Sequence, residues 1–211
     1  MSDLQMSKNN DESLLESLRK GELFPVSDQS KLASDTNDQN RKLPFLIRRD
    51  GKWFYRGEPI LRSSLISLFS GMLTRDEKGN YYLETPSERG IIEVEDAPFL
   101  IVDIHWDGCG RQQVISLRTN VDQMLCLNND HPLKVDLTIP FKSGETGAIP
   151  YVRVRKGKGK FDIWARLSRA VYYEFALLAE RGIYNGKCCY GVWSQNQFFP
   201  LGYCGQNGCS W

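Results

Sequence analysis

The chain has 211 residues, of which 41% are hydrophobic, and a formal net charge of +1. This hydrophobic content is enough to build a core, in one large domain or two small ones. A charge so close to zero argues against a general nucleic-acid or anionic-membrane binder, because such proteins carry a clear excess of Lys and Arg. A charged ligand would therefore have to bind to a local cluster of charged side chains.

Two further features concern the compartment. No apolar run approaches the roughly 20 residues that span a bilayer, and the first residues lack the apolar stretch of a secretion signal. We therefore expect a cytoplasmic protein without a membrane partner. The six cysteines are then expected to be free thiols, and with only two histidines beside them we expect no metal and no cofactor.

Residues 1–42 are polar, with one short amphipathic stretch around Leu14, Leu15 and Leu18 that ends at Gly21. We expect a flexible leader over this range. A small N-terminal domain, residues 43–89, should follow. It begins with two short strands joined by a turn at Asp50-Gly51, continues with an amphipathic helix from Pro59, and ends with a turn at residues 78–80 and a strand.

A larger C-terminal domain is predicted over residues 90–211. Period-two alternation indicates strands at 91–95 and 99–106, with further strands to residue 141 in an antiparallel meander. The spacing of apolar residues within 161–182 favours one long helix, with Asp162 as its N-cap. Two strands, "CCYGVWS" and "QFFPLGY", should complete the core.

A weak internal repeat appears when the chain is shifted by 106 residues, which pairs Leu65 with Val171 and Phe69 with Phe175. The shift also aligns the basic stretch "IPYVRVRKGKGK" with the earlier "LPFLIRRDGK". Arg153 and Arg155 then belong to a solvated strand face, with Asp136 as a possible partner. Lys156, Lys158 and Lys160 alternate with glycines in a turn that could hold an anion, although the phosphate-loop pattern is absent.

The blocks "DGKWFYRGEPILRSSLISLF", "TPSERGIIEVEDAPF", "TNVDQMLCLNNDHPL" and "PYVRVRKG" resemble a bacterial family numbered 1285 among the domains of unknown function. The resemblance covers about residues 43–202. It implies a duplicated core, a C-terminal half similar to a pleckstrin-homology fold, a ligand site between the two halves and a signalling or regulatory role. Together with the predicted elements, it indicates an α+β fold with a duplicated strand-helix-strand core and one long helix in its C-terminal domain.

Several polar residues are candidates for a binding site. Glu95 and Asp96 stand at the end of a strand where the two predicted halves should meet, and they could do acid-base chemistry or hold a cation. They could equally fix a turn, with Asp96 accepting backbone hydrogen bonds, or pair with Arg62 or Arg169. Asn120 and His131 lie within blocks that carry the resemblance. The full set of ligand-binding candidates is Arg62, Glu95, Asp96, Asn120, His131, Arg155, Lys156, Lys158 and Arg169.

The leading hypothesis is a cytoplasmic ligand-binding or regulatory module whose partner is a small anionic molecule or a peptide. The basic candidates would supply charge, and the two acids would supply acceptors. An alternative is an enzyme that uses Glu95, Asp96 and His131 in acid-base chemistry. A further alternative is a protein-interaction scaffold that uses a sheet edge and the leader. Nucleic acid is not expected as a partner, because no aromatic pattern of an RNA-binding sheet is present.

Overall fold

The computed structural model describes Glu12, Glu16 and residues 41–84, 89–136, 148–157 and 161–204. Within these residues there are fifteen strands, and the helices α3 and α4 are each nine residues long. The chain divides into two compact units between Pro98 and Phe99, and of the later residues Gly157 and Phe161 group with the first unit.

The first unit contains a six-stranded sheet in the order β3-β2-β1-β6-β5-β4. Neighbouring strands are antiparallel except β1 and β6, which run parallel at the centre of the sheet. The elements are β1 (Lys42–Ile47), β2 (Trp53–Tyr55), β3 (Glu58–Pro59), α3 (Ser63–Gly71), β4 (Leu73–Arg75), β5 (Tyr81–Glu84) and β6 (Arg89–Val94). The predicted turns at Asp50-Gly51 and at residues 78–80 are confirmed, and Gly51 and Gly79 take the positive φ that such turns require.

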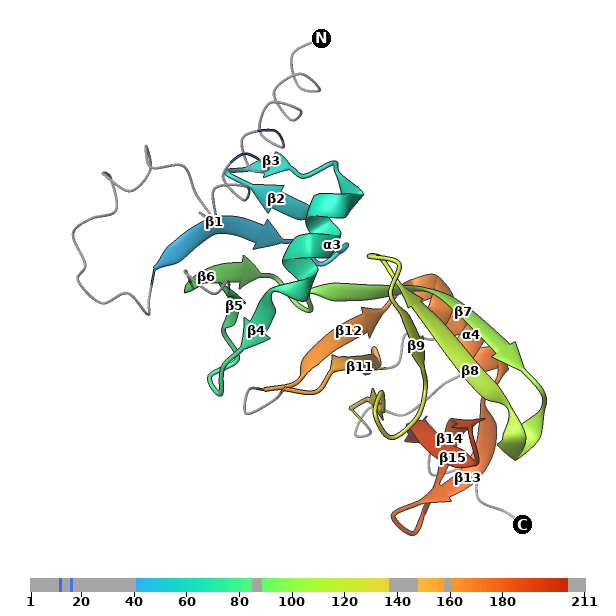
Figure 1. Cartoon of the computed structure of the whole chain (residues 1–211). Coiled ribbons are helices and arrows are strands. Elements are labelled where there is room, and N and C mark those ends of the chain that lie inside the picture. Colours follow the sequence, from blue (N-terminus) through green and yellow to red (C-terminus); the bar gives the residue numbers. More distant parts are fainter. Residues whose placement is uncertain are drawn as a thin grey trace. The chain divides into compact units, whose positions relative to one another are not determined.

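The core of the first unit lies between α3 and one face of this sheet (Figure 1). Phe69 of α3 is fully buried, and its ring centroid lies 5.1 Å from that of Phe45 and 6.3 Å from that of Trp53. Leu65, one turn earlier on the helix, is also buried. The four-residue spacing of Leu65 and Phe69 therefore forms the buried stripe that the sequence predicts.

The second unit contains another six-stranded sheet, in the order β10-β11-β12-β7-β8-β9. Here β12 and β7 form the parallel pair, again at the centre. The elements are β7 (Phe99–Asp107), the 3-10 helix η2 (Gly110–Gln112), β8 (Val114–Thr119), β9 (Met124–Cys126), β10 (Leu133–Lys134), β11 (Tyr151–Arg155), β12 (Ile163–Leu167) and α4 (Arg169–Leu177). Helix α4 packs along β7 (Figure 1), and the backbone N–H of Ser168, just before it, donates to the carbonyl of Ile101.

A β-bulge between Ile101 and Asp103 changes which face of β7 is buried. Phe99 and Ile101 are buried before the bulge and Ile104 after it. The sequence predicted uninterrupted alternation, with Trp106 on the same face as Ile104. Because the bulge inserts one residue into the ladder, the alternation is interrupted there. Trp106, near the end of the strand, is 41% exposed.

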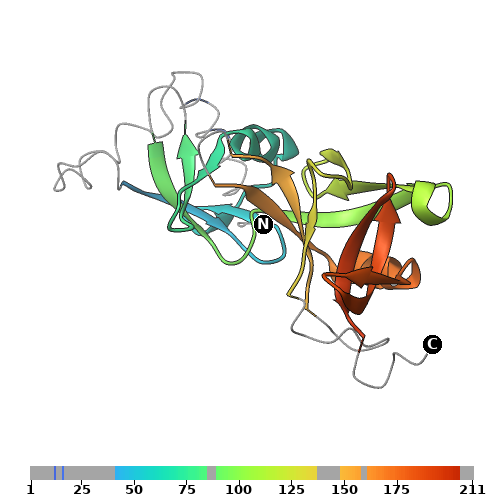
Figure 2. The same ribbon diagram turned by 90° about the horizontal axis from the view of Figure 1, so that it is seen from below.

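A third sheet, in the order β13-β14-β15, follows α4 in the second unit. It consists of β13 (Glu180–Tyr184), β14 (Lys187–Ser194) and β15 (Gln197–Tyr203), and Figure 2 shows these strands in orange and red from a second direction. Gln195 and Asn196 form the tight turn between β14 and β15, and both have positive φ, as a two-residue hairpin turn requires. The two predicted final strands are therefore confirmed.

The predicted α+β fold class, with one long helix on a sheet similar to a pleckstrin-homology domain, is wrong. The described residues are mainly β, and the region predicted as a helix over 161–182 divides into β12, α4 and the start of β13. Ile163, Ala165 and Leu167 are buried at every second residue, which is the period of a strand. The side chain of Ser168 accepts a hydrogen bond from the N–H of Val171, so Ser168 and not Asp162 is the N-cap.

The predicted duplicated core is not reproduced by the sheets. Helices α3 and α4 do begin 106 residues apart, at Ser63 and Arg169, and Val171 and Phe175 are buried like their counterparts Leu65 and Phe69. The strands that follow each helix pair antiparallel in chain order, but β4, β5 and β6 join the sheet of β1, whereas β13, β14 and β15 form a sheet of their own. Among the described residues, no helix is long and apolar enough to cross a membrane.

Candidate functional site

Glu95 and Asp96, the two acids at the end of β6, both contact Arg49. The backbone N–H of Arg49 donates to Oε2 of Glu95 over 2.9 Å, and the Nε atom of Arg49 lies 3.9 Å from Oδ2 of Asp96. The backbone N–H of Glu95 donates to the carbonyl of Ile47. These contacts connect the end of β1 to the end of β6, and they are what a pair of acids fixing a turn would make.

Arg62 and Arg169 stand at the starts of the two helices. Arg62 is the residue before α3, and its guanidinium lies 3.7 Å from Oε1 of Glu12. Arg169 is the first residue of α4, and its Nε atom donates to the hydroxyl of Tyr173 over 3.1 Å. Each arginine therefore contacts a residue other than Glu95 and Asp96, the partners that the sequence suggested.

Asn120 completes the pairing of β7 with the end of β8. Its side-chain Oδ1 accepts a hydrogen bond from the backbone N–H of Leu100 over 3.0 Å, and its own N–H donates to the carbonyl of Leu100 over 2.8 Å. Both hydrogen bonds go to the backbone of a neighbouring strand. Asn120 thus has a structural role at this position.

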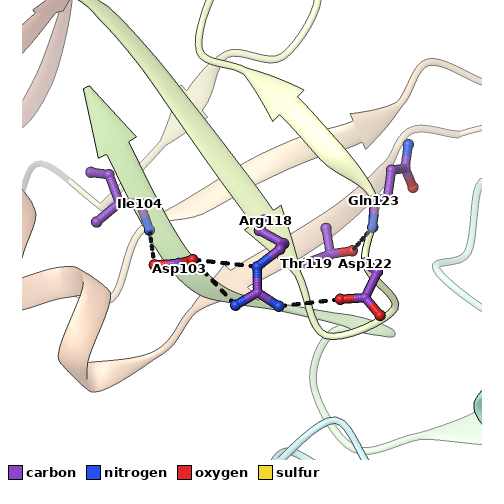
Figure 3. A network of polar contacts seen from close by, with 6 residues as sticks. All are labelled: Asp103, Ile104, Arg118, Thr119, Asp122 and Gln123. Carbon is purple, nitrogen blue, oxygen red and sulfur yellow. Dashed lines mark hydrogen bonds and ion pairs between the residues drawn. The ribbon is translucent and has the colours of Figure 1, made fainter. Parts of the chain in front are cut away.

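An ion-pair network that the sequence did not suggest covers the surface of β7 and β8 (Figure 3). Arg118 donates to Asp103 from Nε and Nη2 over 3.3 and 3.2 Å, and to Asp122 from Nη1 over 3.1 Å. Asp103 raises the pKa of Arg118, mainly through this hydrogen bond. The network lies beside the bulge of β7 and joins that strand to the turn that follows β8.

His131 belongs to a loop that is held by Arg153. Its ring Nδ1 donates to the carbonyl of Arg153 over 2.8 Å, and Oδ1 of Asn128 accepts from its backbone N–H. The guanidinium of Arg153 in turn donates to the carbonyls of Asp130 and Asn129, over 3.0 and 2.9 Å. It also pairs with Asp162 over 3.1 Å, and the Arg153 side chain is only 15% exposed.

Strands β10, β11 and β12 place five basic and aromatic side chains on one face of the second sheet. Lys134 lies opposite Tyr151, Tyr151 lies opposite Arg166, and Arg153 lies opposite Trp164. The residues between them, Val152 and Ala165, are fully buried on the other face. We call this set the basic–aromatic face; its members are Lys134, Tyr151, Arg153, Trp164 and Arg166.

The members of the basic–aromatic face are accessible from solvent to different degrees. Lys134 is exposed, and its Nζ atom lies 5.6 Å from the ring centroid of Trp164. The other four side chains are partly exposed. Sequence reasoning treated Arg153 as solvated and missed Trp164 and Arg166, which it placed in a helix. The period-two pattern of "IWARL" would have placed both on the face of a strand.

The basic stretch after β11 is described only in part. Arg155 is partly buried, and burial lowers the pKa of its guanidinium. Lys156 is exposed. Lys158 and Lys160, on which the predicted anion-binding turn also depends, lie outside the described residues. That turn stays a prediction.

Comparison with known proteins identifies the family. Residues 36–97 match the N-terminal domain and residues 98–201 the C-terminal domain of DUF1285, described as a domain and a protein of unknown function. A DUF1285 family protein from Silicibacter pomeroyi DSS-3 is 36% identical, with a TM-score of 0.64, over 78% of this chain and 83% of that one.

A second crystal structure, of a DUF1285 family protein from Shewanella baltica OS155, is 25% identical, with a TM-score of 0.45, over 64% of this chain and 91% of that one. No curated protein matches the chain. The two domain matches follow one another directly and together span most of the sequence. The chain therefore belongs to the DUF1285 family, whose function is unknown.

Proposed function

We propose that this protein is a ligand-binding module that holds a small organic anion on the basic–aromatic face of its second unit. The observation that carries the proposal is the register of β10, β11 and β12, which puts Lys134, Arg153 and Arg166 beside Tyr151 and Trp164. In a chain with a formal net charge of +1, three cations on one sheet face are a local concentration of positive charge.

The chemistry of this face fits an anion that carries a planar group. Guanidinium and ammonium groups donate to carboxylate or phosphate oxygens, and an aromatic side chain offers a surface for stacking. Arg153 is already held by Asp162 and two backbone carbonyls, so it is fixed in place before a ligand arrives. Lys134, which is exposed, is the cation that a ligand can reach most easily.

Binding is better supported than acid-base catalysis. Glu95 and Asp96 contact Arg49, and the ring of His131 donates to a backbone carbonyl, so each of the three proposed catalytic groups has a structural contact. A regulatory role in the cytoplasm fits this proposal. The described cysteines are free, as is usual in a reducing compartment.

Thermal unfolding of the full chain tests the proposal. We expect AMP, which carries a phosphate and a planar base, to raise the Tm relative to chloride at matched ionic strength, and to do so more than phosphate or citrate. An anion at 100 times its Kd adds about 2.7 kcal/mol to the free energy of unfolding. Substitution Lys134→Ala should remove most of this increase. The matched control is Lys187→Ala, whose lysine lies 5.4 Å from the ring of Tyr203 on the third sheet.

Two results would overturn the proposal. One is an equal increase in Tm for the natural chain and for Lys134→Ala, which would place the anion elsewhere on the protein. The other is the absence of any increase with all three anions. The control separates loss of a binding cation from loss of a cation–π contact, because Lys187→Ala removes only the latter.

A further inference from the structure

Two cysteines face one another across the third sheet. The sulfur atoms of Cys188, in β14, and Cys204, just after β15, are 3.1 Å apart. The backbone N–H of Cys204 donates to the carbonyl of Cys188 over 3.1 Å. Neither residue is fully buried. The two thiols are therefore already in contact and within reach of solvent.

A β-bulge creates this pairing. From the hairpin turn, β14 and β15 pair regularly from Ser194 with Gln197 as far as Gly191 with Pro200. The register then shifts, so that Tyr190 pairs with Gly202. Without the shift, Cys188 would lie opposite Tyr203. The one-residue insertion brings Cys204 to this position instead.

The backbone geometry of the pair suits a disulfide. Two residues that are directly opposite in an antiparallel ladder and joined by a backbone hydrogen bond have Cα atoms about 5.5 Å apart. Disulfides most often join Cα atoms that are about 5.5–6 Å apart. Sulfur atoms in contact at 3.1 Å therefore need only a small movement of the side chains to form the bond.

The surroundings distinguish this pair from the neighbouring thiol. Arg181 of β13 is exposed, and its pKa is raised mainly by its hydrogen bond with the Tyr190 hydroxyl and to a smaller extent by Cys204 and Cys188. Arg181 therefore interacts electrostatically with both of these partly exposed cysteines. Cys189, by contrast, is fully buried, and burial raises its pKa.

We propose that Cys188 and Cys204 form a redox-active pair that a peroxide oxidises reversibly to an intrachain disulfide. One thiolate attacks an oxygen of hydrogen peroxide and becomes a sulfenic acid, while the O–O bond breaks and releases hydroxide, which a proton converts to water. The second thiol attacks that sulfur and displaces the remaining oxygen as water. Two thiols and one hydrogen peroxide thus give one disulfide and two waters, and a dithiol reductant restores both thiols.

The disulfide would fasten the end of β15 to the start of β14. In the reduced protein, one backbone hydrogen bond and the thiol contact join the two cysteines, just beyond the ladder pair of Cys189 with Tyr203. Oxidation would close a covalent loop around the whole hairpin and its turn. This modification does not depend on ligand binding at the basic–aromatic face.

The experiment uses the full chain, treated with hydrogen peroxide at low concentration and then alkylated. We expect the number of alkylated cysteines to fall from six to four, and dithiothreitol to restore all six. No Lys or Arg follows Lys187, so trypsin leaves residues 188–211 in one peptide. Chymotrypsin, which cleaves after aromatic residues such as Tyr190 and Phe198, separates the peptide that holds Cys188 and Cys189 from the peptide that holds Cys204 and Cys209. Fragmentation of the linked peptides, together with the variants below, then identifies the two bonded cysteines.

Three variants make the result decisive. Cys188→Ser and Cys204→Ser should each prevent the loss of two alkylation sites, whereas Cys109→Ser, which removes an exposed cysteine elsewhere, should leave the loss unchanged. A linkage between Cys204 and Cys209, or one that uses Cys189, would overturn the proposal. So would oxidation of Cys109 under conditions that leave Cys188 and Cys204 reduced.

Discussion

Arg153 donates a hydrogen bond from Nη1 to Oδ2 of Asp162 over 3.1 Å, and joins two strands to a loop through the same guanidinium. Asp162 lies just before β12, whereas Arg153 lies in β11 and its other acceptors belong to the loop before β10. The two side chains are 15% and 29% exposed. The pair is therefore more protected from solvent than an ordinary surface ion pair.

This geometry predicts a large effect for Arg153→Met. The substitution removes three hydrogen bonds and leaves the Asp162 carboxylate without this partner, so the free energy of unfolding should fall by about 2 kcal/mol. Urea unfolding measures the change. The control is Arg169→Met, which removes an exposed arginine and should change stability by less than about 0.5 kcal/mol. Equal effects of the two substitutions would contradict the structural role of Arg153.

The hydrogen bonds of Asp76 should make the free energy of unfolding depend on pH in the acid range. Burial raises its pKa, but hydrogen bonds from the N–H groups of Asn80 and from the hydroxyl of Tyr82 outweigh this, so the net pKa is lowered. A lowered folded-state pKa contributes stability that is present above the unfolded value of about 3.9 and is lost as the pH falls through the folded value.

The substitution Asp76→Asn tests this sign. At pH 7 the variant should be less stable than the natural chain, and the difference should shrink below about pH 4 as the natural carboxylate takes up a proton. Urea unfolding at a series of pH values from neutral to acid gives both curves. A difference that stays constant over the whole range would show that the Asp76 charge contributes nothing.

Gly90 has no room for a side chain. A Cβ atom at this position would lie 2.3 Å from Cγ of Leu43, which is buried. Substitution Gly90→Ala should therefore lower the free energy of unfolding by about 1–3 kcal/mol. Gly71, the last residue of α3, has open space around it. Gly71→Ala should raise stability by about 0.4–1 kcal/mol, because it restricts the unfolded chain.

A double substitution identifies the clash at Gly90. If Leu43 is the obstacle, Leu43→Ala makes room for the new methyl group, and the double variant should lose less stability than the sum of the two single variants. Unfolding of all four chains in urea gives the coupling. Strict additivity would show that Gly90→Ala acts through the strand backbone and not through Leu43.

The network of Arg118 should depend on salt. Its ion pairs are largely exposed, so screening by high salt should remove most of their effect. We expect Asp103→Asn to lower the Tm slightly in dilute buffer and not at all in about 1 M salt, where the Debye length is about 3 Å. Asp107→Asn, which removes a more exposed carboxylate at the end of the same strand, is the control. A decrease in Tm that persists at high salt would contradict the prediction.

Local sequence patterns allowed the strands and tight turns to be predicted, but not the β-bulges that interrupt the strands. The final hairpin was found from its aromatic and branched residues. The shift that pairs Cys188 with Cys204 depends on a bulge within it, and no local composition marks a bulge. The same holds for β7, where the bulge after Ile101 interrupted the predicted alternation.

The helix error arose because two periods coincide in one segment. Ile163, Leu167 and Val171 are spaced as on a helix, yet Ile163, Ala165 and Leu167 are spaced as on a strand, and both sets are buried. Ser168, a good N-cap residue, marks the change from one to the other. Giving weight to that residue would have shortened the helix and revealed Trp164 and Arg166 as strand residues.

Candidate binding residues were harder to predict than strands, because their partners are distant in the sequence. Arg49 lies 46 residues from Glu95, and Arg153 lies 22 residues from His131. The resemblance ranked His131 and Asn120, but only the structure shows that one holds a loop and the other a strand end. Long-range pairing of this kind requires the topology, which the sequence alone did not supply.

The parallel pair at the centre of each large sheet has a consequence for how the protein is made. In the first unit, β1 and β6 are the first and last strands, yet they lie side by side. During synthesis, local hairpins can form from β1 and β2 and from β4 and β5. The parallel pairing of β1 with β6 can form only after β6 has left the ribosome. The second unit repeats this order with β7 and β12. In each of the two six-stranded sheets, the parallel pair at the centre is therefore the last pairing to form.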